Sequence, residues 1–163
     1  MRSTPTTVLL AVGLVSGAVG VLAGCSGPAD GTGYLQVSDL KGMSAGDHFA
    51  AEPARVTARL GATSRGCVTV RVDDVERMPL WPEGTRVAED LDDPGTYVVD
   101  LPGGTTLRTG DSFEATGVVD ADGLPFGDGT GPESKVAAVL GYCVLDAAPV
   151  AFADAAAITP MPQ

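Results

Sequence analysis

The first candidate for chemistry in this sequence is the stretch at residues 42–46, Gly-Met-Ser-Ala-Gly, which matches the G-x-S-x-G pattern of a nucleophile elbow. His48 is the only histidine and follows the serine closely. An elbow needs a preceding strand, a following helix, and acid and histidine partners later in the chain. Gly46 and Pro53 interrupt any helix here, and no histidine follows His48. We therefore predict that the chain is not an enzyme, and we interpret His48 as a solvated residue near a domain boundary.

A second candidate is an acidic segment that contains Asp120, Asp122, Asp128 and Glu133. Carboxylate oxygens are the ligands that Ca²⁺ prefers. The spacing does not fit an EF-hand loop, because Leu124 stands two positions after Asp122, where another oxygen ligand is needed. We interpret the segment 120–131 as a turn and an acidic loop, with a weak cation site as the alternative. No metal site or other cofactor is assigned.

Three cysteines are present, and two of them, Cys67 and Cys143, lie outside the N-terminal region. In a compartment outside the cytosol an even pair is expected to form a disulfide. Such a bond would close a long loop and contribute about 4 kcal/mol in the chain-entropy model. Two free thiols or a shared metal are the alternatives, although two cysteines and one distant histidine are too few for a zinc site.

Trp81 is the only tryptophan and has apolar neighbours on both sides, Leu80 and Pro82. An exposed tryptophan on a β-barrel face can stack a sugar or a base. A single tryptophan among apolar residues is more often part of the core. Trp81 therefore remains a candidate ligand contact beside the packing interpretation.

The N-terminus carries Arg2 and then no charge from Thr6 to Ala23, which is typical of a secretory signal. The strongly apolar part is shorter than the roughly 20 residues that cross a membrane. Leu22-Ala23-Gly24-Cys25 resembles the lipobox of bacterial lipoproteins. That resemblance implies cleavage before Cys25, diacylglycerol on its sulfur, and a location at the extracytoplasmic face of the cell membrane. Two acyl chains anchor a protein firmly, whereas one gives only reversible binding. An ordinary cleaved signal and a short membrane helix are the alternatives.

The chain is acidic, with a formal net charge of −11. Nucleic-acid backbones require clustered Lys and Arg, and the basic residues of this chain are scattered singly along it. We predict no nucleic-acid partner. No polybasic segment adds attraction to anionic lipid, so the lipid alone would hold the protein on the membrane.

Strand patterns begin at Ala54, where Val56, Ala58 and Leu60 alternate with polar residues. Residues 68–72 repeat this alternation with Thr69 and Arg71 on the outward side, so the two segments predict a hairpin. A second hairpin is predicted from Thr96–Leu101 and Thr105–Arg108 across a Pro-Gly-Gly turn. Residues 113–119 are expected to extend this meander.

Residues 132–140 predict a short helix, with Pro132 at its first position and Gly141 just past its end. Val144 and Leu145 are then expected to form a last strand, which the disulfide would join to the second. The fold class is all-β or nearly so. We favour a small OB-like barrel of five to six strands over a sandwich, because closure removes exposed edges.

Several motifs carry a second resemblance, namely Pro53–Leu60 (PARVTARL), Gly66–Val70 (GCVTV), Leu80–Thr85 (LWPEGT), Leu107–Asp111 (LRTGD) and Cys143. Together they are similar to a recurrent class of small lipoproteins from high-GC Gram-positive bacteria. The likeness covers about residues 53–145 and implies the fold and the compartment, but no catalytic residue. The chain lacks the glycine-rich segment that this class has after its Gly-Asp strand.

The predicted organisation has a cleaved signal at 1–24, a lipidated tether with weak structure at 25–52, a β-domain at 53–149 and a C-terminal tail at 150–163. Two functions follow from it. The favoured one is a non-catalytic envelope lipoprotein that contacts another envelope protein or takes part in envelope assembly. The alternative is an extracytoplasmic module that binds a small molecule, a carbohydrate or a cation through Trp81 or the loop at 120–133.

Overall fold

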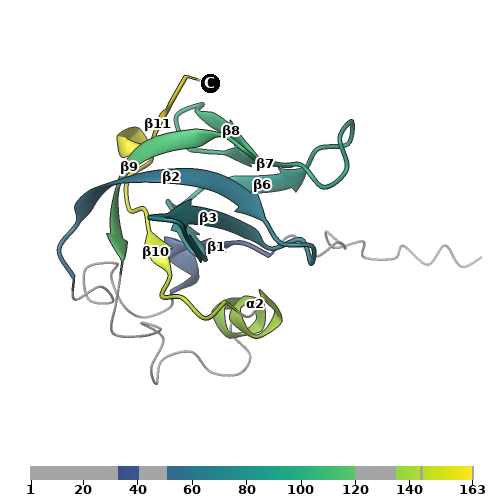
Figure 1. The fold of residues 1–163 in the computed structure, drawn as a ribbon, viewed down its shortest axis with the longest axis horizontal. Helices are drawn as coiled ribbons and strands as arrows, with labels where there is room; N and C mark the ends of the chain where they lie inside the picture. Colours follow the sequence, from purple (N-terminus) through teal and green to yellow (C-terminus); the bar gives the residue numbers. More distant parts are fainter. Residues whose placement is uncertain (1–32, 41–50, 120–134, 144, 163) are drawn as a thin grey trace, which may run out of the picture.

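The computed structural model describes residues 33–40, 51–119, 135–143 and 145–162. The fold is mainly β, with one α-helix in the described part of the chain (Figure 1). The strands are β1 Leu35–Gln36, β2 Ala54–Ala62, β3 Val68–Val72, β4 Val75–Arg77, β5 Pro79–Trp81, β6 Arg86–Glu89, β7 Tyr97–Asp100, β8 Thr106–Arg108, β9 Ser112–Val119, β10 Val150–Ala151 and β11 Thr159–Pro160. The helical elements are η1 Val37–Asp39, α2 Lys135–Cys143 and η2 Ala155–Ala157. No helix in the described ranges is long and apolar enough to cross a membrane.

The strands form two sheets. The larger has eight strands in the order β1-β5-β10-β9-β2-β3-β4, with β11 paired to β9 beside this path. It is mixed, because β1 and β10 run parallel to β5 while the other pairs are antiparallel. The smaller sheet has the order β6-β7-β8. The described pairing path does not close on itself, so the OB-like barrel stays a prediction.

The strands predicted from alternating residues are confirmed as β2, β3 and β9, and the two predicted on either side of the Pro-Gly-Gly turn are confirmed as β7 and β8. Both predicted hairpins are present. The predicted meander is wrong in one respect. β9 pairs with β2 rather than with β8. This pairing places Phe113 beside Ala58, and both are buried on the same face of the sheet. Burial of the apolar face therefore selects the partner of β9, rather than proximity in sequence.

Two apolar clusters make up the core. The first joins the inner face of the large sheet to the small sheet and contains Trp81, Val99, Leu107, Phe113 and Phe152. The second lies under helix α2 and contains both bonded cysteines with Leu35, Leu80 and Val136. Figure 1 shows α2 at the opposite end of the molecule from β7 and β8. Strand β5 serves both clusters, because Leu80 faces one and Trp81 the other.

The predicted helix is present as α2, but the strand expected at Val144 and Leu145 is absent at Leu145, while Val144 and the predicted helix start at Pro132 lie outside the described residues. The helix includes Gly141 and ends at Cys143, while Leu145 lies outside any strand and packs against the second cluster. Its apolar positions Val136, Val139, Leu140 and Cys143 recur at helical spacing. This stripe continues past the glycine, which explains why the helix does not stop at Leu140 as predicted.

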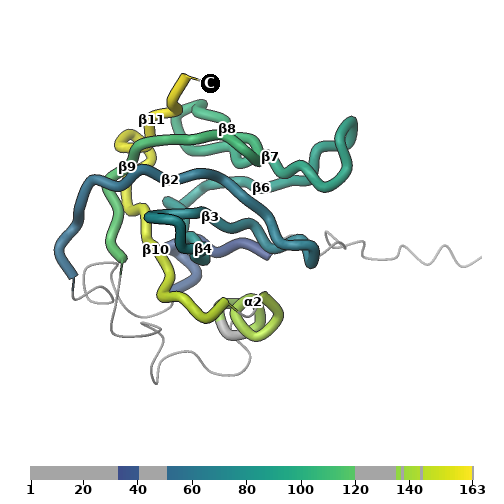
Figure 2. Tube along the Cα trace, viewed as in Figure 1, coloured from purple at the N-terminus to yellow at the C-terminus, as the bar shows by residue number. Residues whose placement is uncertain are grey.

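Both ends of the described chain also correct the predicted organisation. Residues 34–40 were expected to be irregular, yet Leu35 is fully buried and lies in β1 beside β5. In Figure 2 this N-terminal segment runs near α2, with which it is in contact. Residues 150–160, expected as part of a tail, supply β10 and β11 and bury Phe152 and Ile158. Strands of two residues are too short to give an alternation that sequence reasoning can detect.

Candidate functional site

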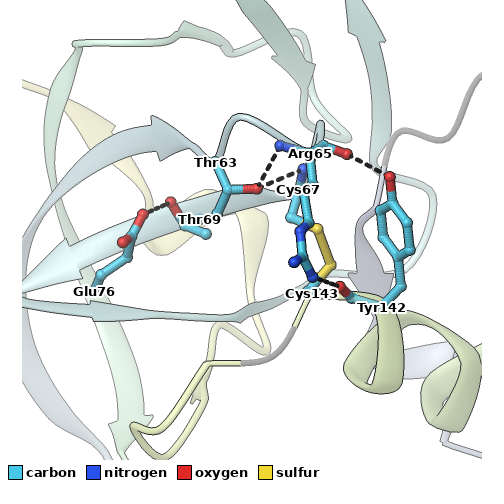
Figure 3. Close-up of a disulfide and its surroundings, with 7 residues drawn as sticks. All are labelled: Thr63, Arg65, Cys67, Thr69, Glu76, Tyr142 and Cys143. Carbon is cyan, nitrogen blue, oxygen red and sulfur yellow. Dashed lines mark hydrogen bonds between the residues drawn. A yellow bond between two sulfur atoms is a disulfide. The ribbon is translucent and has the colours of Figure 1, made fainter.

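The disulfide predicted between Cys67 and Cys143 is present, with Cα atoms 5.8 Å apart. It joins the start of β3 to the end of α2 and lies in the second core cluster. Tyr142 and Arg65 lie beside it and exchange hydrogen bonds: the tyrosine hydroxyl donates to the Arg65 carbonyl, and the Arg65 guanidinium donates to the Tyr142 carbonyl (Figure 3). The helix is therefore held to the sheet by one covalent link and two hydrogen bonds.

Gly33 lies directly against the disulfide. A Cβ at this position would come within 2.8 Å of the Cys143 sulfur. The Gly33 N–H donates to the Gly66 carbonyl at 3.0 Å, and the Val68 N–H donates to the Gly33 carbonyl at 2.9 Å. Gly33, which follows Cys25 in the sequence, thus joins the fold beside the disulfide, at a position where only a residue without a side chain fits.

The structure places Trp81 in the core rather than on a surface. Its side chain is fully buried, and its ring centroid lies 5.5 Å from that of Phe152 and 6.2 Å from that of Phe113. The indole N–H has no hydrogen-bond partner among the described residues. A ligand in solvent has no access to this ring, so packing is the role that the structure shows for Trp81.

The remaining candidates fall outside the described residues. These are Cys25, His48, the Gly-Met-Ser-Ala-Gly stretch at 42–46 and the acidic segment from Asp120 to Glu133. Within the described ranges, no group of three or more His, Cys, Asp or Glu side chains could hold a metal ion.

A row of polar side chains lies on the solvent side of β2 and β3, which we call the outer face. It carries Arg55, Thr57 and Arg59 on β2, and Thr69 and Arg71 on β3. The neighbouring positions Ala58, Leu60, Val70 and Val72 point the other way into the core. Alternation along each strand therefore separates a polar face from a buried one.

Arg59 and Arg71 lie directly opposite each other in the antiparallel register of β2 and β3. Like charges in this position repel and destabilise a strand pair. The Arg59 Nε donates to the Gly110 carbonyl at 3.0 Å, which fixes that side chain over the sheet. Neither arginine is within ion-pair distance of a carboxylate in the described part of the chain.

Three other basic side chains have acidic partners. Arg55 pairs with Glu114, and Lys135 pairs with Asp39 at 2.9 Å. Arg108 pairs with Asp90, and the backbone N–H of Asp92 together with the Arg108 guanidinium lowers the pKa of that carboxyl group below its usual value. Arg65, Arg77 and Arg86 resemble the arginine pair in that they form no ion pair with a carboxylate among the described residues.

Two depressions on the outer face share the arginine pair. One has a volume of about 280 Å³ and extends from Arg59 and Arg71 over Gly61 toward Thr69 and Glu76. The other, of about 350 Å³, extends from the same arginines toward Thr57 and the Asp73-Asp74 turn. Both guanidinium groups thus border space that a ligand group could enter from solvent.

Gly61 and Thr69 shape the first depression. They are opposite each other in the register of β2 and β3, and a Cβ on Gly61 would lie 3.1 Å from the Thr69 hydroxyl oxygen. Thr69 is buried and donates its hydroxyl to Glu76 Oε1 at 2.7 Å (Figure 3). A glycine inside a strand often marks a place where another group approaches the backbone.

The turn between β3 and β4 limits the second depression. Val72 pairs with Val75, so Asp73 and Asp74 alone form the turn, with φ angles of 50° and 62°. Two-residue hairpins favour this left-handed conformation but usually place Asn or Gly in it. The turn sets two exposed carboxylates near the arginine pair.

Comparison of the chain with known proteins adds no constraint. No family model, no curated protein and no solved structure matches it. The outer face is therefore interpreted from its own geometry.

Sequence reasoning identified Arg59 and Arg71 as outward-facing but treated the basic residues as single. The register of the hairpin is what shows the two arginines to be neighbours. It starts next to the turn, where Ala62 pairs with Val68, and it places Arg59 opposite Arg71 three pairs further along. That register depends on the turn conformation, which the sequence of residues 63–67 does not fix.

Proposed function

We propose that this chain is a lipid-anchored binding module of the cell envelope, held to the membrane through Cys25, and that its outer face contacts a partner protein. The lipobox-like sequence Leu22-Ala23-Gly24-Cys25 supports the anchor. The Cys67–Cys143 disulfide supports a compartment in which such bonds persist.

The observation that carries the binding role is the arginine pair on the outer face. Arg59 and Arg71 are opposed across two strands. Glu76 lies opposite Arg71 on its other side, but the cross-strand neighbours of Arg59 are Arg71 and Ser112, so a compensating interaction is missing at Arg59. A partner that covers the pair would supply it. Arginine is also enriched at protein interfaces, where it is often among the residues that contribute most to binding.

The position of the anchor fits this proposal. The described chain begins at Gly33, whose backbone is hydrogen-bonded to Gly66 and Val68 next to the disulfide. A force on the lipid anchor would thus act where two backbone hydrogen bonds and the disulfide hold the chain. The outer face at Arg59 and Arg71 lies further along the same strands and would stay folded and accessible.

The finer fold in this proposal is an OB-like barrel. It is supported by two long strands that each pair with more than one other strand. β2 pairs with both β3 and β9, and β9 pairs with β2, β10 and β11. A barrel would require these shared strands to curve around the two apolar clusters. The described strands would then form most of the barrel wall.

Site-specific photo-cross-linking in intact cells tests the binding role. A photoreactive amino acid at Thr57 probes the outer face, and one at Ala88, which is exposed on β6, serves as the matched control. We expect a discrete protein adduct from position 57 and none from position 88. Absence of an adduct at position 57, or equal adducts at both positions, would contradict the proposal.

The anchor has its own test, which is the intact mass of the protein purified from its native membrane. We expect a chain that begins at Cys25 with a diacylglyceryl group attached. An unmodified, soluble chain would contradict the membrane part of the proposal while leaving the outer face to the cross-linking result.

A further inference from the structure

We propose that Arg59 and Arg71 together bind a carboxylate of an acidic peptide segment on the partner. This inference rests on the proposed function, because it names the chemistry by which the outer face would recognise its partner. It depends on how the two guanidinium groups are placed and on the acidic groups that surround them.

Two guanidinium groups on adjacent strands suit an anion with two oxygens. Each guanidinium presents parallel N–H donors that match a carboxylate or a phosphate. Arg59 is held in place by its bond to the Gly110 carbonyl, so part of its conformational freedom is lost before a ligand arrives. A bound anion would also remove the repulsion between the two arginines.

The acidic neighbours favour a carboxylate over a phosphate. Glu76 borders the first depression, and Asp73 and Asp74 border the second. These negative charges repel a phosphate, which carries close to two charges at neutral pH, more than a carboxylate, which carries one. The site therefore combines attraction for one negative charge with a penalty for a second.

A peptide also matches the rest of the first depression. Glu76 Oε1 accepts the Thr69 hydroxyl, and the carboxylate of this exposed residue can also accept an N–H from a ligand. A peptide supplies both a side-chain carboxylate and backbone N–H donors within a few ångströms of it. Gly61 leaves the floor of the depression open for such a backbone to approach.

The overall acidity of the chain does not prevent this recognition. The formal net charge is −11, but at physiological salt the Debye length is about 8 Å. A carboxylate in contact with both arginines is therefore governed by the groups next to it. The distant negative charges slow the approach of an acidic segment more than they weaken the bound state.

The test is an NMR titration of the full-length purified chain in detergent micelles, observing the Nε–H signals of Arg59 and Arg71. The probes are a tetraglutamate peptide, a tetraglutamine peptide of the same length, and N-acetylglutamate, all at constant ionic strength. We expect saturable shifts at both arginines with tetraglutamate and none with tetraglutamine. N-acetylglutamate, which offers two carboxylates but only one amide N–H and no extended peptide backbone, should bind at least about tenfold more weakly.

Two variants assign the effect. Arg71→Gln should weaken tetraglutamate binding by about tenfold or more, as expected when a charge-assisted hydrogen bond is removed. Arg86→Gln is the matched control, because Arg86 is an exposed strand arginine opposite Asp100, as Arg71 is opposite Glu76, but it lies on the small sheet and not on the outer face. It should leave binding unchanged.

Each remaining result has a fixed meaning. Equal shifts with the two peptides, shifts that do not saturate, or unchanged binding in Arg71→Gln would overturn the inference. Equal affinity for N-acetylglutamate and tetraglutamate would overturn the peptide as occupant. If these titrations fail while the adduct at position 57 persists, the outer face binds its partner without the arginine pair, and only this inference is lost.

Discussion

The two faces of the β2–β3 hairpin differ in what their residues contribute. On the inner face, Leu60 lies opposite Val70, and both are buried in the first core cluster. On the outer face, one position earlier on β2, Arg59 lies opposite Arg71 with both side chains exposed. The inner pair stabilises the fold, whereas the outer pair places two like charges side by side, with Glu76 opposite Arg71 as an acidic neighbour. The inner face supports folding, and the proposed binding role belongs to the outer face.

The largest expected effect comes from the inner face. Phe113→Ala on β9 removes a fully buried ring that contacts Trp81 and Phe152. It should lower the free energy of unfolding by about 3–5 kcal/mol, through lost burial and the cavity left behind. Urea denaturation followed by circular dichroism measures this.

Thr116→Ala is the control for that prediction, since Thr116 lies on the same strand but is exposed. It should change stability by no more than about 0.5 kcal/mol. Similar losses in both variants would remove the distinction between the two faces.

The disulfide should have the next largest effect. Replacing both Cys67 and Cys143 by Ala should cost about 2–4 kcal/mol, because the unfolded chain regains the freedom that the link removes. Thermal unfolding monitors the loss, and reduction of the wild-type protein should reproduce it. An unchanged unfolding midpoint in both experiments would show that packing of α2 alone holds this cluster.

Thr69 sharpens the comparison, because it points to the outer face and yet is buried. Thr69→Val keeps the shape but removes the hydroxyl that donates to Glu76, and it should cost about 1 kcal/mol. Thr57→Val, at an exposed position of the same face, should be neutral. A neutral Thr69→Val would mean that the threonine does not orient Glu76.

A smaller effect is expected where an arginine has a carboxylate partner. The pKa of Asp90 is lowered by the N–H of Asp92 and by the Arg108 guanidinium. Because the folded pKa lies below the unfolded one, the stabilisation is present above the ordinary pKa of aspartate and is lost as the pH falls through the folded value. In Arg108→Gln, the pKa of Asp90 measured by NMR should rise toward 3.8. An unchanged pKa would assign the whole shift to the backbone.

Alternation made much of the fold predictable. β2, β3, β7, β8 and β9 each have one side that faces the core and one side that faces solvent. Apolar and polar residues therefore tend to alternate along them in the sequence. β5 and β10 are buried throughout, and their two or three residues give no period. Pairing between distant strands, such as β9 with β2, depends on which apolar faces share a core and is not encoded locally.

The site was predictable only in part. The pairing of Cys67 with Cys143 followed from the number of cysteines and the expected compartment, and it is confirmed. Trp81 was ambiguous, because an apolar surrounding in sequence suits both a core residue and an exposed platform. The arginine pair needed a register that depends on backbone geometry in the turn at residues 63–67. Residue types were visible in the sequence, but their neighbours were not.

The stability of Arg71→Gln tests most directly whether the outer face is kept for binding rather than for folding. Relief of the repulsion with Arg59 is offset by loss of the cross-strand neighbour of Glu76, so the free energy of unfolding should stay within about 1 kcal/mol of the wild-type value. The measurement is urea denaturation in a buffer without carboxylates, with Arg86→Gln as the control. A loss of more than about 1 kcal/mol in Arg71→Gln would show that the arginine supports the fold and would contradict the account.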